Sequence, residues 1–196
     1  MGNFIRDNLN KDGVDRRGFL QCMAWAGTGM MYALKGGVLT SLALGPAGIE
    51  AAQMDKMKGV DFSFIQISDS HIGFNKEANP DVTATLQVAV DRINSAQAPP
   101  DFLLHTGDIS QLSKASEFDT AEQVLKGAKA GRIFFVPGEH DVLTDDGKQY
   151  LDRFGKDTKG KGWYSFDHKG AHFIGLVNVL DLKAGGLGFL ILGRRR

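Results

Sequence analysis

Three apolar runs in this chain each end in polar, ionisable residues whose types could do chemistry together. The three ends read Ser68-Asp69-Ser70-His71, Thr106-Gly107-Asp108 and Gly138-Glu139-His140-Asp141. In an open parallel sheet the carboxyl ends of neighbouring strands lie along one edge, so groups far apart in the sequence meet there. The pattern therefore predicts one crevice lined by several carboxylates and two imidazoles.

Carboxylates that lie this close together repel one another and raise one another's pKa unless a cation lies among them. Oxygen and imidazole ligands together suit Zn, Mn or Fe. A carboxylate shared by two such ions, about 3.5 to 4 Å apart, builds a hydrolytic site that makes hydroxide available near neutral pH and neutralises phosphoryl oxygens. The residue types therefore suit metal-dependent hydrolysis at phosphorus.

The elements that must position these groups alternate between strands and helices. Apolar runs at 62–67, 102–105 and 133–136 predict three strands. A first helix is expected to have Asn79 as its cap and Pro80 as its first residue, and a second helix to cover about 114–128. Strands and helices in this order predict an α/β fold with a parallel sheet. The apolar stripes of the two helices are Val82, Leu86, Ala89, Val90 and Ile93, then Phe118, Ala121, Val124, Leu125 and Ala128.

A different pattern follows the third strand. A short helix is expected at about 147–154, followed by two further apolar runs at 163–168 and 171–180. These runs meet at Lys169-Gly170, a pair that suits a tight turn. The sequence therefore predicts a β-hairpin after the parallel part of the fold.

The three polar ends together resemble a known family. They contain "DSH", "GD" and "GEHD" in order, and the calcineurin-like metallophosphoesterases carry DxH, then GD, then GNH followed by Asp or Glu, then a lone His and GHxH. The resemblance covers roughly residues 60–180. It implies an αββα sandwich, a phosphate-ester substrate, and two divalent or trivalent metal ions as cofactors, of Mn, Fe or Zn. The layout looks more like the phosphodiesterase and purple acid phosphatase side of the family than like its protein phosphatases.

The resemblance also implies roles for individual residues. Asp69 and His71 would hold the first metal ion, and Asp108 would bridge both ions. Glu139 stands where the family usually has the asparagine ligand of the second ion, and its carboxylate would add a negative charge there. Metal ligands are therefore expected at all four positions.

Two further residues carry catalytic roles by the same resemblance. His140 matches the histidine that faces the substrate and stabilises or protonates the leaving oxygen, and Asp141 would orient it. His105 is expected to pack or to form a hydrogen bond in the core, whereas His168 and His172, which flank the predicted hairpin turn, are expected to be structural or solvated.

The lone His and the GHxH block of the family do not occur here, because no histidine follows His172. We therefore expect a metallophosphoesterase domain over 58–196 that is C-terminally truncated, with a weakened second metal site and an exposed apolar face. The alternative to an active phosphoesterase is a catalytically inactive fragment that binds one metal ion or a partner. A third reading is a membrane-tethered accessory protein whose crevice is only a charged surface.

The first 52 residues read as a separate segment. Arg16-Arg17, followed one residue later by Phe19-Leu20, resembles a twin-arginine export signal, and an apolar, Gly-rich run follows. This implies the twin-arginine translocase as an export partner and a periplasmic or secreted location. Cleavage could follow Ala47 or Ala51. An uncleaved helix over 19–44 could instead tether the protein to a membrane, and a buried pair of helices is the remaining alternative.

Composition limits the other partners. The 196 residues are 42% apolar and 23% charged, which is enough for one globular domain with a core. The 23 basic residues balance the 23 acidic ones, so no net field attracts nucleic acid, and none is expected as a partner. The single cysteine, Cys22, lies in the export segment, so we expect neither a disulfide nor a cysteine metal site in the mature domain.

Overall fold

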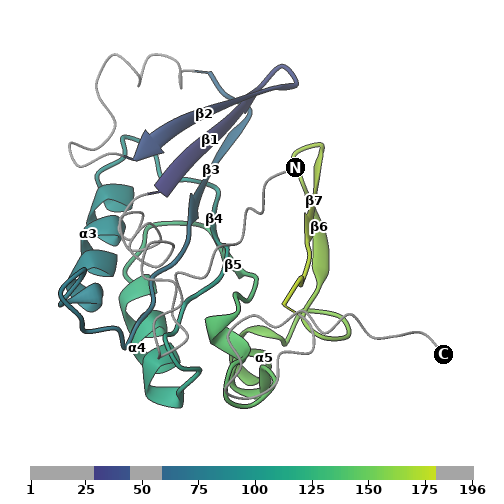
Figure 1. The fold of residues 1–196 in the computed structure, drawn as a ribbon. Helices are drawn as coiled ribbons and strands as arrows, with labels where there is room; N and C mark the ends of the chain where they lie inside the picture. The colour runs from purple at the N-terminus through teal and green to yellow at the C-terminus, as the bar shows by residue number, and fades with distance from the viewer. Residues whose placement is uncertain (1–28, 45–58, 180–196) are drawn as a thin grey trace, which may run out of the picture.

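The computed structural model describes residues 29–44 and 59–179 (Figure 1). Its main sheet has the strand order β2-β1-β3-β4-β5, and a separate two-stranded sheet pairs β6 with β7. The strands are β1 Gly29–Lys35, β2 Val38–Leu44, β3 Phe62–Ile67, β4 Phe102–His105, β5 Ile133–Phe135, β6 Tyr164–His168 and β7 Ala171–Gly175. The helices of the described part are α3 Val82–Asn94, α4 Ala115–Leu125 and α5 Lys148–Phe154, with a 3₁₀ turn, η2, at His140–Val142.

The parallel core of the sheet confirms the predicted α/β class. Strands β3, β4 and β5 are parallel, with Phe64 opposite Phe102 and Leu103 opposite Ile133. Helices α3 and α4 connect them and cover the same face of the sheet (Figure 1). The fold is a mixed α/β arrangement consistent with the predicted sandwich class. Because all three strands run the same way, their carboxyl ends share one edge.

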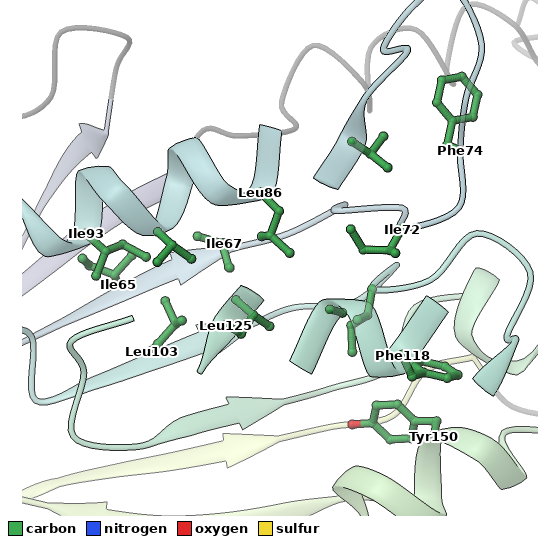
Figure 2. Close-up of a cluster of buried hydrophobic side chains, with 14 of the residues drawn as sticks. Ile65, Ile67, Ile72, Phe74, Leu86, Ile93, Leu103, Phe118, Leu125 and Tyr150 are labelled. Carbon is green, nitrogen blue, oxygen red and sulfur yellow. The ribbon is translucent and has the colours of Figure 1, made fainter. Parts of the chain in front are cut away.

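The first core lies between this sheet and helices α3 and α4 (Figure 2). Ile65 and Leu103 from the sheet and Phe118 from α4 are completely buried there. The buried residues of α3 are the five that its predicted stripe contained. The helix begins two residues later than expected, at Val82, because the carboxylate of Asp81 caps it by accepting a hydrogen bond from Ala84 N at 2.9 Å.

The second core lies on the opposite face of the sheet and is aromatic. Phe62, Phe64 and Phe102 form its centre, and the β6–β7 hairpin covers them. Phe166 of β6 stacks on Phe134 with ring centroids 3.9 Å apart, and Phe173 of β7 meets Phe102 edge-on at 5.1 Å. Aromatic contacts of this kind stabilise sheet packing beyond the area they bury.

The predicted hairpin turn at Lys169-Gly170 is confirmed. Both residues have positive φ, 44° and 84°, as tight hairpin turns require. Asp101, at the start of β4, accepts hydrogen bonds from Lys169 Nζ at 2.7 Å and lies 3.0 Å from His168 Nε2. His168 therefore has the structural role expected for it.

The main difference from the sequence-based prediction is at residues 29–44, which the sequence pattern places in the export segment. They form the β1–β2 hairpin, and β1 pairs antiparallel with β3, with Met31 opposite Ile65. Met31 and Ala33 are buried, and Tyr32 stacks on Phe64 with ring centroids 4.8 Å apart. Residues 29–44 therefore belong to the sheet, although they lie before the expected domain boundary at residue 58.

The turn of this hairpin explains the difference. Gly36 and Gly37 have φ of 55° and 80°, and a Gly-Gly pair between apolar runs is a hairpin signal that an apolar export segment can conceal. Arg16-Arg17, Cys22 and both expected cleavage positions lie outside the described residues. Within 29–44 and 59–179, no helix has the length and apolar character needed to cross a bilayer.

Ala33→Asp tests whether the β1–β2 hairpin belongs to the folded domain. Ala33 is 2% exposed, so an unpaired carboxylate there should lower the free energy of unfolding by about 3 kcal/mol or more. Val38→Asp is the control, because Val38 is 65% exposed and the change should cost no more than about 0.5 kcal/mol. Chemical denaturation measures both. Equal stability of the two variants would show that the hairpin is not part of the sheet.

Candidate metal centre

Three loops at the carboxyl edge of the sheet bring the predicted site residues together. The loop after β3 and the loop after β4 are joined by backbone hydrogen bonds from Asp69 N to Gly107 O, 3.0 Å, and from His71 N to Asp108 O, 2.8 Å. Ile72 and Ser110 continue this pairing as an isolated parallel bridge. The polar ends of the strands are therefore fixed to one another by their backbones as well as by the sheet.

Three of the predicted metal ligands have an uncommon backbone conformation. The φ angles of Asp69, His71 and Asp108 are 58°, 43° and 51°. These angles lie in the left-handed region, which residues other than glycine seldom adopt. Such a conformation costs of order 1–3 kcal/mol per residue and persists only where the surroundings impose it. The hydrogen bonds between the two loops impose it here, so the ligands are held in place before any ion binds.

Two glycines allow the loops after β4 and β5 to touch. Gly107 has φ of 109°, and a side chain at this position would overlap the backbone of Gly138. A side chain at Gly138 would in turn overlap Asp108. The glycines of the "GD" and "GEHD" stretches are therefore needed for the close approach that brings Asp108 next to His140.

The ligand atoms are arranged as around one ion. Nε2 of His71 lies 3.7 Å from Oδ2 of Asp108 and 3.8 Å from Oδ1 of Asp69. One ligand atom each of His71, Asp108 and His140 lies within 4.8 Å of the other two. These separations are too long for good hydrogen bonds, but atoms that each bind the same ion at about 2.0–2.3 Å are separated by distances of this order. The residues therefore fit a metal ion.

The electrostatics of the cluster favour a cation. Burial alone would lower the pKa of His71, but the carboxylates of Asp69, Asp108 and Asp141 outweigh burial and raise it. Burial would raise the pKa of Asp69, yet its interactions with His71 and Ser68 lower it instead. The carboxylates thus draw positive charge to the imidazole of His71, and a metal ion would supply that charge without a proton.

The imidazole of His140 has a defined orientation. Its Nδ1 lies 2.7 Å from the carbonyl oxygen of Gln111, so Nδ1 carries the proton that it donates, and Nε2 of the neutral ring keeps its lone pair. Its backbone N–H donates to Oδ1 of Asp108 at 2.9 Å, and its carbonyl accepts from Ser113 Oγ at 2.7 Å. The rings of His140 and His71 meet edge-on, with centroids 4.7 Å apart.

Asp141 differs from the role predicted for it. Its carboxylate is completely buried and forms no hydrogen bond with the ring of His140; the carbonyl of Gln111 orients that ring instead. Asp141 accepts hydrogen bonds from Ile109 N, Ser110 N, Ser110 Oγ and Gly138 N at 2.8 to 3.1 Å. Burial raises its pKa to about 6, although the backbone donors oppose the shift. Asp141 therefore joins the loops after β4 and β5.

Glu139 is exposed and does not belong to the cluster of ligand atoms in the described part of the chain. It is the residue before η2, which turns His140 and Asp141 into the buried loops. Its predicted role as a ligand of a second ion therefore stays a prediction. The structure brings together His71, Asp108 and His140, with Asp69 beside them.

The other histidine near this edge is structural, as expected. His105 is buried, its Nε2 lies 2.9 Å from Ser70 Oγ, and its ring stacks on Phe135. Burial lowers its pKa to about 4, which keeps the ring neutral. The sequence interpretation missed Ser110, Gln111 and Ser113, which position Asp141 and His140. Their residue types alone carry no signal that separates them from ordinary loop residues.

Comparisons with known proteins agree with this geometry. A family model described as calcineurin-like phosphoesterase matches residues 62–194, which include every residue of the cluster. A search of curated proteins finds no match.

His71→Gln should weaken metal binding. His71 Nε2 lies between two carboxylates, so we expect it to bind the ion directly. Loss of a residue that only supports a metal ligand lowers the affinity by about 10- to 100-fold. We therefore expect the affinity for Mn²⁺ or Zn²⁺ to fall by at least about 100-fold. Isothermal titration of the metal-free protein measures the affinity. His172→Gln is the matched control, because His172 lies on the exposed face of the β6–β7 hairpin, where it pairs with Asp167 at 2.8 Å. Unchanged affinity in His71→Gln would contradict the assignment.

Asp141→Ala should destabilise the fold and the site together. Four donors would lose their acceptor in a buried position, and we expect the free energy of unfolding to fall by about 3–5 kcal/mol. Asp119→Ala provides the comparison, because Asp119 is 64% exposed and its ion pair with Arg153 should contribute at most about 1 kcal/mol. Denaturation curves that are similar for the two variants would rule out a central role for Asp141.

Proposed function

The chain belongs to the calcineurin-like phosphoesterase family, and we propose that it is a metal-dependent hydrolase of phosphate monoesters or diesters. One observation carries the proposal. His71, Asp108 and His140 come from three different strand ends, and their ligand atoms lie within 4.8 Å of one another. Two imidazoles and a carboxylate brought together at one edge of the sheet are ligand types that hydrolytic metal centres use.

The donor set suggests which ions bind. His71, Asp69 and Asp108 would hold the ion, and mixed imidazole and carboxylate ligands suit Mn, Fe or Zn. When bound, such an ion supplies hydroxide near neutral pH and neutralises charge on phosphoryl oxygens. The three loop backbones keep these side chains in position, which lowers the cost of ordering them when the ion binds.

His140 is the residue that we propose acts on the substrate. Its Nδ1 is held by the carbonyl of Gln111, so the ring cannot turn away from the cluster. When the ring is protonated, Nε2 can donate a proton to a phosphoryl or leaving-group oxygen beside Asp108. The hydrogen bond between its own N–H and Asp108 keeps the two residues at a constant separation.

A more specific version of this proposal is a centre that binds two metal ions. For a second ion we propose Asp108 as the bridge and Glu139 as a further ligand. Oδ1 of Asp108 accepts the N–H of His140, and Glu139 is exposed, so the second ion would be held more weakly than the first. The exposure of Glu139 also favours a second candidate function, a protein that binds one metal ion without catalysing hydrolysis.

We also propose export by the twin-arginine route, on the basis of Arg16-Arg17, to the periplasm or beyond. The pairing of β1 with β3 bears on where a leader could be removed. Cleavage after Ala47 or Ala51 would remove two strands from the sheet and expose buried Ile65. Any cleavage that leaves the domain intact would therefore occur before Gly29.

Hydrolysis of bis(p-nitrophenyl) phosphate in the presence of Mn²⁺ tests the function. The wild-type protein should release p-nitrophenol, and Asp108→Asn should reduce kcat/KM by at least about 100-fold, because it removes a metal ligand and charge from the centre. His172→Gln should keep wild-type activity. A folded wild-type protein that binds Mn²⁺ but shows no turnover above Asp108→Asn would favour the non-catalytic candidate.

A further inference from the structure

A cavity of about 220 Å³ adjoins the candidate metal centre. The β1 strand contributes Met30 and Tyr32 to its wall, β3 contributes Gln66, and Asp69 belongs both to the cavity and to the metal centre. Asp69 Oδ1 lies 3.8 Å from His71 Nε2, so the cavity and the ligand cluster share a boundary. A group held by the cluster would therefore be directly next to this space.

The polar side-chain groups of Tyr32 and Gln66 on the cavity wall already form hydrogen bonds. Tyr32 OH donates to Gln66 Oε1 at 3.2 Å, and Gln66 Nε2 donates to Thr106 Oγ1 at 3.0 Å. The ring of Tyr32 is held parallel to that of Phe64, with an interplanar angle of 11°. The aromatic ring of Tyr32 and the side chain of Met30 are thus the surfaces that this wall offers to a ligand without breaking a hydrogen bond.

The charge of the residues that line the cavity further limits the kinds of ligand that it can bind. Among the described residues that line this cavity there is no lysine or arginine, and the only ionisable carboxylate is Asp69. An anionic group would therefore meet no cationic side chain among these residues to offset the loss of its hydration. The volume is also smaller than the roughly 300–1,000 Å³ typical of pockets for drug-sized ligands. The cavity suits one small, neutral, preferably flat group.

We propose that this cavity binds the organic group of the substrate, a neutral single-ring alcohol esterified to the phosphate. The inference rests on the proposed function, because the phosphoryl group must be held at the metal centre for its ester group to reach the cavity. The β1–β2 hairpin lies outside the 62–194 match to the family model. The hairpin therefore adds a substrate-selecting wall that the matched part of the domain does not supply.

Non-hydrolysable phosphonates separate the cavity from the metal centre. The full chain, loaded with Mn²⁺, is titrated calorimetrically with phenylphosphonate, methylphosphonate and 4-carboxyphenylphosphonate. Phenylphosphonate should bind at least about tenfold more tightly than methylphosphonate, because its ring removes apolar surface from water. The added carboxylate of the third probe should abolish that preference.

Two variants of β1 locate the preference. Met30→Trp should fill the cavity and Tyr32→Ala should remove its aromatic wall, and each should bring phenylphosphonate affinity down to that of methylphosphonate, which itself stays unchanged. Val38→Ala, on the exposed part of the same hairpin, should keep the wild-type ratio. Met30→Trp leaves the Tyr32 stacking in place, so it is informative even if Tyr32→Ala fails to fold.

Each other outcome overturns the inference in a recognisable way. Equal affinity for phenyl and methyl probes in the wild-type protein would show that the cavity takes no ring, with the proposed function intact. A phenyl preference that survives Met30→Trp would place the ring elsewhere. Failure of all three probes to bind the Mn²⁺-loaded protein would overturn the proposed function, and the cavity's role with it.

Discussion

The carboxylate of Asp141 holds the loop after β4 and the loop after β5 together. The arrangement of the other site residues depends on the distance between these two loops. Asp141 accepts hydrogen bonds from both sides, from Ile109 and Ser110 in the loop after β4 and from Gly138 in the loop after β5. Asp108 lies directly before Ile109, and His140 directly before Asp141. The position of Asp108 relative to His140 therefore depends on the hydrogen bonds that Asp141 accepts from both loops.

Such a connection matters because the loops are under local strain. Asp69, His71 and Asp108 have left-handed backbone conformations, which cost energy for any residue that carries a Cβ atom. The hydrogen bonds from Asp69 to Gly107 and from His71 to Asp108 stabilise these conformations. The folded chain thus meets the cost of positioning the ligands in advance, and the affinity for an ion is not reduced by having to order them.

Much of the fold could be predicted because its signals are periodic. The α3 stripe, the β4 bounds and the Lys169-Gly170 turn follow from spacing and residue type alone. The β1–β2 hairpin could not be predicted in the same way, because an apolar, Gly-rich run reads equally well as strand or as export segment. Its assignment depends on contacts with β3, which no local window contains.

The candidate site likewise contains residues that the sequence predicts and residues whose role only the structure reveals. Asp69, His71, Asp108 and His140 can be predicted because each lies in a loop that follows an apolar strand, and the parallel topology brings these loops together. The function of Asp141 depends instead on which backbone N–H groups happen to face it, and residue type does not encode this. The role of Glu139 rests on its family position alone: the residue lies at the surface directly before the η2 turn, and its part in a second metal site stays a prediction.

The strand order of the main sheet has a consequence for how the protein is made. After the β1–β2 hairpin, strands β3, β4 and β5 are added one after another on the β1 side of the sheet, in the order in which the chain is synthesised. The hairpin is complete before β3 is available, and each later strand finds an edge already formed beside it, which limits the loop-closure entropy of each addition. A nascent chain would thus extend its sheet from a local hairpin, and His140 would join Asp69, His71 and Asp108 only when β5, the last strand of the main sheet, has paired with β4.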